Sequence, residues 1–183
     1  QFPAGFAAAS SAFVDNAVFS NLLEGVLRMA IFLTYLYLVS RMEEIRTVFC
    51  YHGAEHKTIF CYEAGLPLTV ENVKKQSRFH PRCGTSFLLI VMVVSIILFS
   101  FITWSNVWVR MGMRLLLLPV VGGISYEFIK LAGRSKNKCI AWLTKPGLWM
   151  QRMTTNEPDE KQIEVAIASM NAVIPENSED DKW

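Results

Sequence analysis

The sequence predicts an all-α polytopic membrane protein with about three transmembrane helices, a cytoplasmic helical segment and C-terminal amphipathic helices. Hydrophobic residues make up 52% of the 183-residue chain and charged residues 19%, a balance that favours the membrane class. Three apolar runs come close to the ~20 residues that a helix needs to cross the hydrocarbon. The polar segment between the first two runs holds all three histidines of the chain.

The first apolar run covers residues 21–41 and predicts a transmembrane helix. In its apolar stretch only Glu24 and Arg28 carry charge, and at i,i+4 on a helix they can pair with each other. They lie near the start of the run, where an interfacial position is tolerated. A helix lying in the membrane interface is the alternative, because the uncharged part, residues 29–40, is short for a span. Residues 1–20 are interpreted as a loop or as the end of a preceding element.

Residues 42–85 form a polar segment that is predicted to be largely helical. Its first helix is expected to stop at Gly65 and Pro67, an order of residues that commonly ends a helix. Thr69 is suited to cap a second, short helix, because its hydroxyl can accept a hydrogen bond from a first-turn amide. An irregular turn around Pro81 leads to the next apolar run.

Residues 86–131 are predicted to form a transmembrane hairpin, with Thr85 or Ser86 capping its first helix. The stretch 87–104 contains no charged residue and is the clearest membrane span in the sequence. The link to the second helix is short, so the two helices should run antiparallel. Pro119 and two adjacent glycines lie inside the second helix, where such residues mark a kink or a close helix contact.

Residues 132–174 are predicted to contain an interfacial segment and an amphipathic helix. Aromatic and apolar residues surround Lys145-Pro146-Gly147, a pattern typical of a chain that lies in the interface. Pro158, followed by two acidic residues, predicts the start of a helix that ends near Val173. Residues 175–183 are acidic and are predicted to be a disordered tail.

The distribution of basic residues predicts the orientation of the chain. Lysines and arginines are concentrated in residues 42–85 and after the last apolar run, whereas the link between the second and third runs has only Arg110. The positive-inside rule then places both polar segments and the C-terminus in the cytoplasm, at the plasma or inner membrane. Membrane lipids are therefore expected partners. A net charge of +2 and scattered basic residues without a recognition motif argue against nucleic acid.

The motif His52-Gly53-Ala54-Glu55-His56 is the main candidate for chemistry. Its order, His-x-x-Glu-His, is the inverted form of a zinc-peptidase motif, in which two imidazoles bind zinc and the glutamate is the general base. On a helix these side chains continue an apolar stripe, so we expect them to face the buried side. A buried charge is costly without a partner, and a bound metal supplies one. A hydrogen-bonded core cluster is the alternative. The stripe consists of positions 45, 48, 49, 52, 55, 56, 59, 60 and 63.

Three further residues are candidates for the third metal ligand. His80 and Cys83 form a His-x-x-Cys turn, and Cys83 precedes a helix N-terminus, where a thiolate is favoured. Cys83 could equally be a buried thiol beside a capping turn, or a nucleophile with His80 as base. Glu127 is a carboxylate near the cytoplasmic end of the last span, where it could reach the site or pair with Lys130 or Arg78.

Five ordered blocks of the sequence carry a family resemblance: residues 51–58 (Tyr-His-Gly-Ala-Glu-His-Lys-Thr), 61–65 (Cys-Tyr-Glu-Ala-Gly), 80–88 (His-Pro-Arg-Cys-Gly-Thr-Ser-Phe-Leu), 118–127 (Leu-Pro-Val-Val-Gly-Gly-Ile-Ser-Tyr-Glu) and 151–158 (Gln-Arg-Met-Thr-Thr-Asn-Glu-Pro). Together they resemble the YqhQ-like bacterial membrane family, over about residues 20–174. The resemblance implies an integral membrane protein that is described as a metal-dependent enzyme, with no assigned substrate. Family members usually have a further N-terminal portion with a Gly-Gly-Gln type motif and another span, which we expect this chain to lack.

The leading functional hypothesis is a metal-dependent membrane hydrolase whose site faces the cytoplasm. His52 and His56 would bind zinc or a similar divalent ion, and Glu55 would activate water. A peptide or a lipid-linked molecule is compatible with a site beside the membrane. Two other classes are a non-enzymatic membrane protein with a structural metal site, and a transporter or lipid-handling protein in which Glu127 lines a path.

Overall fold

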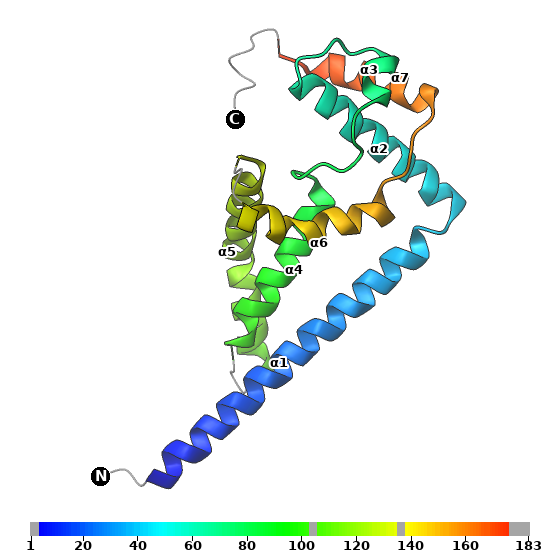
Figure 1. Ribbon diagram of the computed structural model, residues 1–183. Helices are drawn as coiled ribbons and strands as arrows, with labels where there is room; N and C mark the ends of the chain where they lie inside the picture. The colour runs from blue at the N-terminus through cyan, green and yellow to red at the C-terminus, as the bar shows by residue number, and fades with distance from the viewer. Residues whose placement is uncertain (1–3, 103–105, 135–137, 176–183) are drawn as a thin grey trace. The chain divides into compact units, whose positions relative to one another are not determined.

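The computed structural model describes residues 4–102, 106–134 and 138–175, and every regular element in them is an α-helix (Figure 1). These residues contain no strand, which confirms the all-α prediction. The predicted disordered tail lies, from residue 176 on, outside the described residues. The helices are α1 (Ala4–Val39), α2 (Glu43–Glu63), α3 (Val70–Lys74), α4 (Gly84–Ser100), α5 (Val107–Arg134), α6 (Lys138–Thr154) and α7 (Glu160–Val173).

The chain divides into two compact units. The first lies within residues 1–35 and 81–147 and contains most of α1, all of α4 and α5, and the start of α6. The second lies within residues 36–80 and 148–183 and contains α2, α3, the end of α6 and α7. Two helices, α1 and α6, run from one unit into the other.

Two helices are long and apolar enough to cross a membrane. The apolar segments are Val18–Val39 in α1 and Val107–Gly133 in α5. The second predicted span, residues 87–104, corresponds to α4, which is apolar but has only 17 residues and is not among the helices long enough to cross. Residues 1–20 were expected to be a loop or the end of a preceding element. From Ala4 on they are helical and form the first part of α1.

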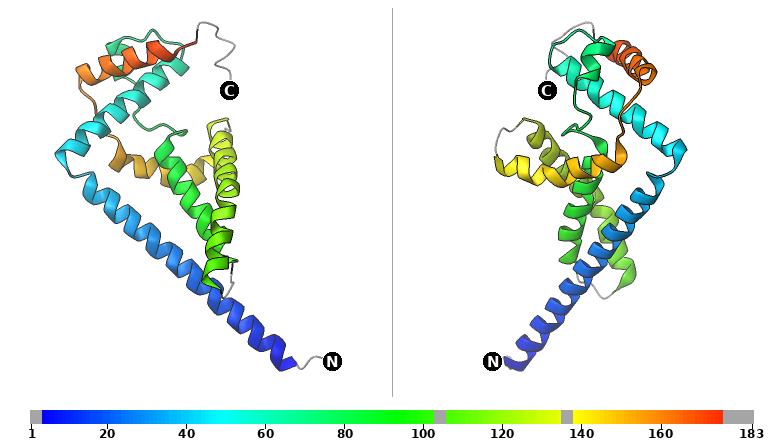
Figure 2. Two further views of the ribbon diagram at one scale, coloured as in Figure 1. Left: turned by 180° about the vertical axis from the view of Figure 1, so that it is seen from behind. Right: turned by 45° about the vertical axis from the view of Figure 1, so that its right-hand side comes forward.

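In the first unit α4 and α5 pack against each other, as both views of Figure 2 show. The start of α4 differs from the prediction, because Cys83 rather than Thr85 or Ser86 is the N-cap residue. The amide of Phe87 donates to the carbonyl of Cys83, so the first helical turn already includes the two predicted caps. The Thr85 hydroxyl lies 3.1 Å from the sulfur of Cys83 instead of capping the next turn.

The sixth helix continues through Pro146, in the part of the chain for which the sequence predicts an interfacial segment. Gly147 follows this proline, and a Cβ atom at Gly147 would lie 2.9 Å from the side chain of Ser86. Because glycine has no side chain, α6 can pass close to the start of α4 within the first unit.

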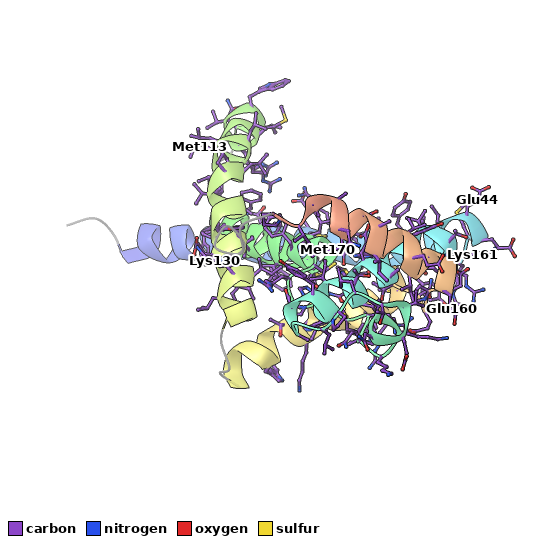
Figure 3. All side chains as sticks on the ribbon, turned by 90° about the horizontal axis from the view of Figure 1, so that it is seen from above. Glu44, Met113, Lys130, Glu160, Lys161 and Met170 are labelled. Atoms are coloured by element: carbon purple, nitrogen blue, oxygen red, sulfur yellow. The ribbon has the colours of Figure 1, made fainter. Side chains whose placement is uncertain are left out.

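The second unit is a small bundle of α2, α3 and α7 around an apolar cluster. Two predicted ends are confirmed: Gly65 adopts a φ of 65° after α2, and Thr69 caps α3 by accepting from the amide of Asn72. Helix α7 begins with a capping box between Asp159 and Gln162. Its first residues, Glu160 and Lys161, and the later Met170 are labelled in Figure 3. The buried cluster consists of Ala54, Cys61, Val73, Ile163 and Ala166.

The buried face of α2 is not the predicted stripe but the face beside it. Val48 is 57% exposed and Glu55 is exposed, although both belong to the stripe. The reason is that α3 and α7 pack on the face of α2 that carries small residues, which allow close approach. On the same face Lys57 meets its partners, Glu157 and the carbonyls of Lys74 and Gln76. The buried residues of α2 are Gly53, Ala54, His56, Lys57, Thr58 and Cys61.

Candidate metal centre

His52 and His56 lie next to each other on α2, one helical turn apart. Their ring centroids are 4.3 Å apart, and the two planes meet at 64°. His56 is 4% exposed and His52 is half-buried. The i,i+4 spacing of the motif therefore brings the two imidazoles together, as the sequence predicts.

Both histidines are oriented by hydrogen bonds to backbone carbonyl groups. The Nδ1 atom of His52 lies 2.8 Å from the carbonyl oxygen of Thr154, and the Nδ1 atom of His56 lies 2.6 Å from that of Arg78. A carbonyl oxygen can only accept, so each ring must carry its proton on Nδ1. In the neutral ring the lone pair is then on Nε2. This is the tautomer and the orienting contact that metal-binding histidines typically have.

The contact of His52 depends on a close crossing between α2 and residues 154–157. The amide of Asn156 donates to the carbonyl of Phe49, with 2.8 Å between the nitrogen and the oxygen. A Cβ atom at Gly53 would lie 2.1 Å from the carbonyl oxygen of Asn156. Only glycine therefore permits this crossing, which holds the carbonyl of Thr154 within reach of His52.

Arg78 links the two segments that orient the histidines. Its carbonyl oxygen accepts from His56, and its guanidinium donates to the carbonyl of Thr155 over 3.2 Å. The chain before the His-x-x-Cys turn is thus tied to the segment that crosses α2. The two backbone segments that accept from the histidines are therefore joined to each other by a hydrogen bond.

His80 lies close to the histidine pair, within the second unit. Its ring centroid is 5.7 Å from that of His56 and 4.6 Å from that of Phe60. Its Nε2 atom lies 3.5 Å from a carboxylate oxygen of Glu63. The side chain of Gln151 accepts from the amide of His80 over 2.8 Å and donates to its carbonyl over 2.7 Å. This reciprocal pair fixes the backbone of His80.

Lys57 is a buried cation beside the pair, and its side chain is only 5% exposed. The ammonium group forms an ion pair with Glu157. It also donates to the carbonyls of Lys74 and Gln76, over 3.1 and 2.9 Å. Three partners satisfy the three donors of the ammonium group. Lys57 therefore joins α2, the end of α3 and the crossing segment, and explains why a charge is tolerated on the buried face.

The structure places the other predicted site residues in different surroundings. Glu55 is exposed on α2, three residues after His52 and next to His56. Cys83 belongs to the first unit, where it is buried at the N-cap of α4. Glu127 also belongs to the first unit, where its carboxylate lies 3.8 Å from the ammonium group of Lys130 and is 70% exposed. The pairing with Lys130 that the sequence offered as an alternative is therefore present.

Two further cysteines, Cys50 and Cys61, lie on α2 near the motif. Cys61 is fully buried in the apolar cluster. Burial raises the pKa of the Cys61 thiol, and it is also the main cause of the raised pKa of Cys50. A raised pKa disfavours the thiolate, which is the form that binds metals or attacks electrophiles.

Sequence reasoning missed the residues that position the histidines, namely Gly53, Lys57, Arg78, Gln151 and Thr154. One signal was available: an isolated glycine in the middle of a helix commonly marks a close backbone approach. The backbone acceptors had no such signal, because Thr154 lies 102 positions after His52. The types and placement of His52 and His56 make them candidates for holding a metal ion.

The chain matches, over residues 2–176, a family described as "Protein of unknown function (DUF1385)". It is 43% identical over 153 residues to the uncharacterized protein YqhQ of Bacillus subtilis (strain 168). The aligned region covers 83% of this chain and 48% of the relative. The chain thus spans about half the length of this curated relative. No solved structure matches it.

Proposed function

This chain belongs to the DUF1385 family of proteins of unknown function, and we propose that it binds a divalent metal ion through His52 and His56. The observation that carries the proposal is the pair of hydrogen bonds from Nδ1 to backbone carbonyls. They fix both rings in the tautomer whose Nε2 atom can bind a metal. Imidazole nitrogen is a preferred ligand of zinc, so zinc is the ion we expect.

We favour Cys83 as the third ligand. It follows His80 by three residues, and its position at the N-cap of α4 favours the thiolate. Two imidazoles and a thiolate are a donor set that zinc commonly binds. His80 and Glu127 are the other candidates, with contacts to Glu63 and Lys130 respectively.

The site is proposed to act in hydrolysis, with Glu55 as the general base. Zinc in such a site lowers the pKa of water and polarises a carbonyl or phosphoryl group. Glu55 stands on the same helix, three residues after His52, so its carboxylate is a neighbour of that side chain. Because Glu55 is exposed, its carboxylate can take a proton from the attacking water and release it to solvent.

We further propose that the protein lies in the plasma or inner membrane, with this site on the cytoplasmic side. The support is the two apolar helices that are long enough to cross a membrane, together with the concentration of basic residues in residues 42–85. The substrate would be a peptide or a lipid-linked molecule that is presented at the membrane surface.

A structural metal site is the second candidate, and one observation favours it. His52 and His56 are tied to two different backbone segments, at Thr154 and at Arg78. A metal held by the pair would fix both rings, and with them the hydrogen bonds that join α2 to the two segments. In that case Glu55 would have no role in the site.

The first experiment is to measure the metal content of the purified protein by inductively coupled plasma mass spectrometry. We expect about one zinc per chain in the wild type. The double variant His52→Ala/His56→Ala should lose it, and Cys83→Ser should show a reduced content. Wild-type protein without stoichiometric metal after gentle purification would refute the metal proposal.

The second experiment separates catalysis from a structural role. Glu55→Gln should retain the metal and lower hydrolysis of a peptide or lipid-linked substrate panel by ~100-fold or more, the usual effect of losing a general base. Glu44→Gln is the matched control, because Glu44 is also exposed on α2 (Figure 3) and undergoes the same change of charge. Equal turnover by the two variants and the wild type would leave only the structural role.

A further inference from the structure

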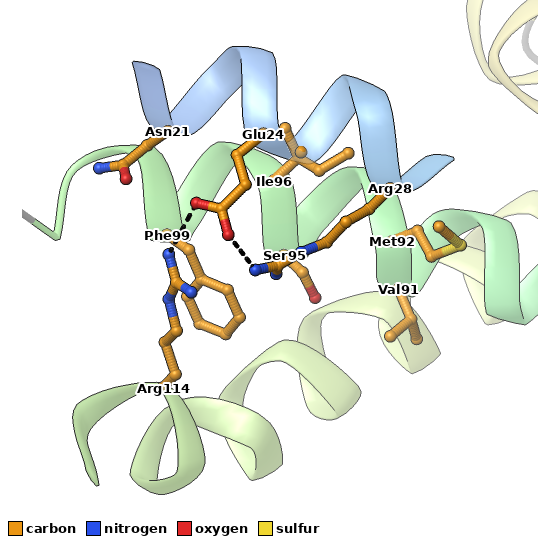
Figure 4. Close-up of a pocket in the computed structure, with 10 residues that line it drawn as sticks. Asn21, Glu24, Arg28, Val91, Met92, Ser95, Ile96, Phe99 and Arg114 are labelled. Atoms are coloured by element: carbon orange, nitrogen blue, oxygen red, sulfur yellow. Dashed lines mark hydrogen bonds and ion pairs between the residues drawn. The ribbon is translucent and has the colours of Figure 1, made fainter. Parts of the chain in front are cut away.

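An open pocket of about 220 Å³ lies on the first unit, between α1, α4 and α5 (Figure 4). Charged side chains enter it from α1 and α5, namely Glu24, Arg28 and Arg114, and α4 supplies a mostly apolar wall. Charged residues within apolar helices are rare, and they are functional candidates when they face an internal space. None of these residues takes part in the proposed metal centre.

The charges in this cavity do not balance. Glu24 forms an ion pair with Arg28, while the guanidinium of Arg114 stays 3.9 Å from the second oxygen of Glu24. That distance is too long for a hydrogen bond. Two cations therefore face one carboxylate, and both remain charged because arginine does not lose its proton in proteins.

Arg114 also has an unsatisfied donor. Among the side chains that the structure describes, its Nε atom is the buried nitrogen or oxygen that lacks a hydrogen-bond partner. The guanidinium lies 5.7 Å from the ring centroid of Phe99, which offers only a cation–π contact. A buried donor without an acceptor costs about 1–3 kcal/mol, and more when it is charged. An anion with several acceptor oxygens would supply the missing partner.

The walls of the cavity are held in place by specific contacts. The side-chain amide of Asn21 donates to the carbonyls of Ser100 and Ile102, each over 3.4 Å, at the end of α4. A Cβ atom at Gly25 would lie 2.7 Å from the side chain of Ile96, so α1 and α4 approach closely at this point. The arginines are thus presented by packed helices, and the cavity is not a chance gap between side chains.

The charged residues lie in the same half of their two apolar segments, toward the first residue of each. Glu24 comes six residues after the start of the apolar segment Val18–Val39, and Arg114 comes seven residues after the start of Val107–Gly133. At 1.5 Å per residue both lie roughly 9–11 Å inside their segments. That is between the surface and the centre of a hydrocarbon layer about 30 Å thick, so the long arginine side chains must reach toward the surface to meet a headgroup, as arginines in membrane helices do. This step rests on the proposed membrane location, and not on the metal centre.

We propose that the cavity binds the phosphate group of an anionic membrane lipid. Arg114 and Arg28 would donate to the phosphate oxygens, since a guanidinium matches phosphate in a bidentate way. The apolar wall formed by Val91 and Met92 would contact the first part of a lipid chain. A free phosphate ion would leave that wall without a partner, which is why we assign the phosphate to a lipid.

The test uses the full purified chain in detergent and measures lipid binding by native mass spectrometry. The probes are phosphatidic acid, phosphatidylcholine with the same acyl chains, and inorganic phosphate as a competitor. Phosphatidic acid should bind the wild type at least ~10-fold more tightly than phosphatidylcholine. Inorganic phosphate at millimolar concentration should not displace it. Equal binding of the two lipids, or displacement by inorganic phosphate, would overturn the proposal.

Two variants locate the binding in this cavity, and one serves as the control. Arg114→Gln should weaken phosphatidic acid binding ~10-fold or more, whereas Arg110→Gln should change it less than about twofold. Arg110 is an arginine one turn away on α5 that does not line the cavity. Ser95→Phe fills the space without changing a charge, and keeps the test decisive if Arg114→Gln does not fold. Unchanged binding by a folded Arg114→Gln or Ser95→Phe variant would refute the site.

The metal content of Arg114→Gln distinguishes this proposal from that of the metal centre. We expect it to equal that of the wild type, because the arginine lies in the first unit and the histidine pair in the second. Loss of lipid binding with retained metal supports the lipid site alone. A chain without metal that still binds phosphatidic acid through Arg114 would leave this inference intact.

Discussion

Gly53→Ala tests whether the close crossing over α2 positions the metal centre. The new Cβ atom would lie 2.1 Å from the carbonyl oxygen of Asn156. A carbon and a carbonyl oxygen normally approach no closer than about 3.3 Å, so the crossing segment must move by roughly 1 Å. The neighbouring atom belongs to the backbone and cannot rotate away. The hydrogen bond from Asn156 to Phe49 and the one from His52 to Thr154 both depend on this segment.

Two opposing effects determine how Gly53→Ala changes the free energy of unfolding. Replacing glycine by alanine inside a helix stabilises by up to about 1 kcal/mol. Overpacking costs about 1–3 kcal/mol, and losing one backbone hydrogen bond costs about 1 kcal/mol more. We therefore expect Gly53→Ala to be destabilised by about 1–3 kcal/mol. Its affinity for metal should fall by about 10–100-fold, the usual effect of losing the partner that orients a histidine.

The assay combines thermal unfolding, followed by circular dichroism in detergent, with metal competition against a chromophoric chelator. Gly122→Ala is the matched control, because Gly122 is also inside a helix and its Cβ atom would meet nothing within 4 Å. This control should be as stable as the wild type or more stable, with unchanged metal affinity. If Gly53→Ala behaves like Gly122→Ala in both measurements, the crossing does not position the site.

Three further predictions concern the second unit. Lys57→Met should lower the free energy of unfolding by about 3 kcal/mol, because it leaves two carbonyls and Glu157 without their cation. Glu157→Gln should lower the free energy of unfolding by less than about 1 kcal/mol, since Glu157 is mostly exposed. Gln151→Leu should cost about 2–4 kcal/mol in urea unfolding, because the amide and the carbonyl of His80 both lose a partner. Cys61 should resist iodoacetamide at pH 8 in the folded protein and react only after unfolding, as detected by mass spectrometry.

The sign of the pH effect at Cys61 follows from its raised pKa. The folded protein keeps the thiol protonated above the reference value of 9.0, whereas the unfolded chain loses the proton there. The contribution of Cys61 to stability is therefore complete below about pH 9 and decreases as the pH rises through the folded pKa. A Cys61→Ala variant should lack this alkaline loss. Rapid labelling of folded protein at pH 8, or an unchanged alkaline slope in the variant, would contradict the burial argument.

Local chain signals were enough to predict the helical class and several helix ends. Thr69 and Gly65 adopt the capping roles expected from their residue types. The helix predicted to begin at Pro158 ends at Val173, close to the predicted end, but its N-cap is Asp159, so Pro158 lies before the helix instead of in its first turn. These features depend on a few neighbouring residues, so they can be recognised in sequence. The sequence did not show that α6 would continue through Pro146, because proline disrupts most helix interiors and stays inside one only where the rest of the fold holds the chain.

The histidine motif by itself determined that two imidazoles would lie together on α2, because i,i+4 spacing has that result on any helix. Only the tertiary structure decided which face of α2 is buried, that Glu55 is exposed, and which nitrogen of each histidine carries the proton. Those outcomes depend on backbone groups at Arg78 and Thr154, far along the chain. Residue type does not encode the position of a carbonyl oxygen, and so the partners that prepare His52 and His56 for a metal could be seen only once the chain was folded.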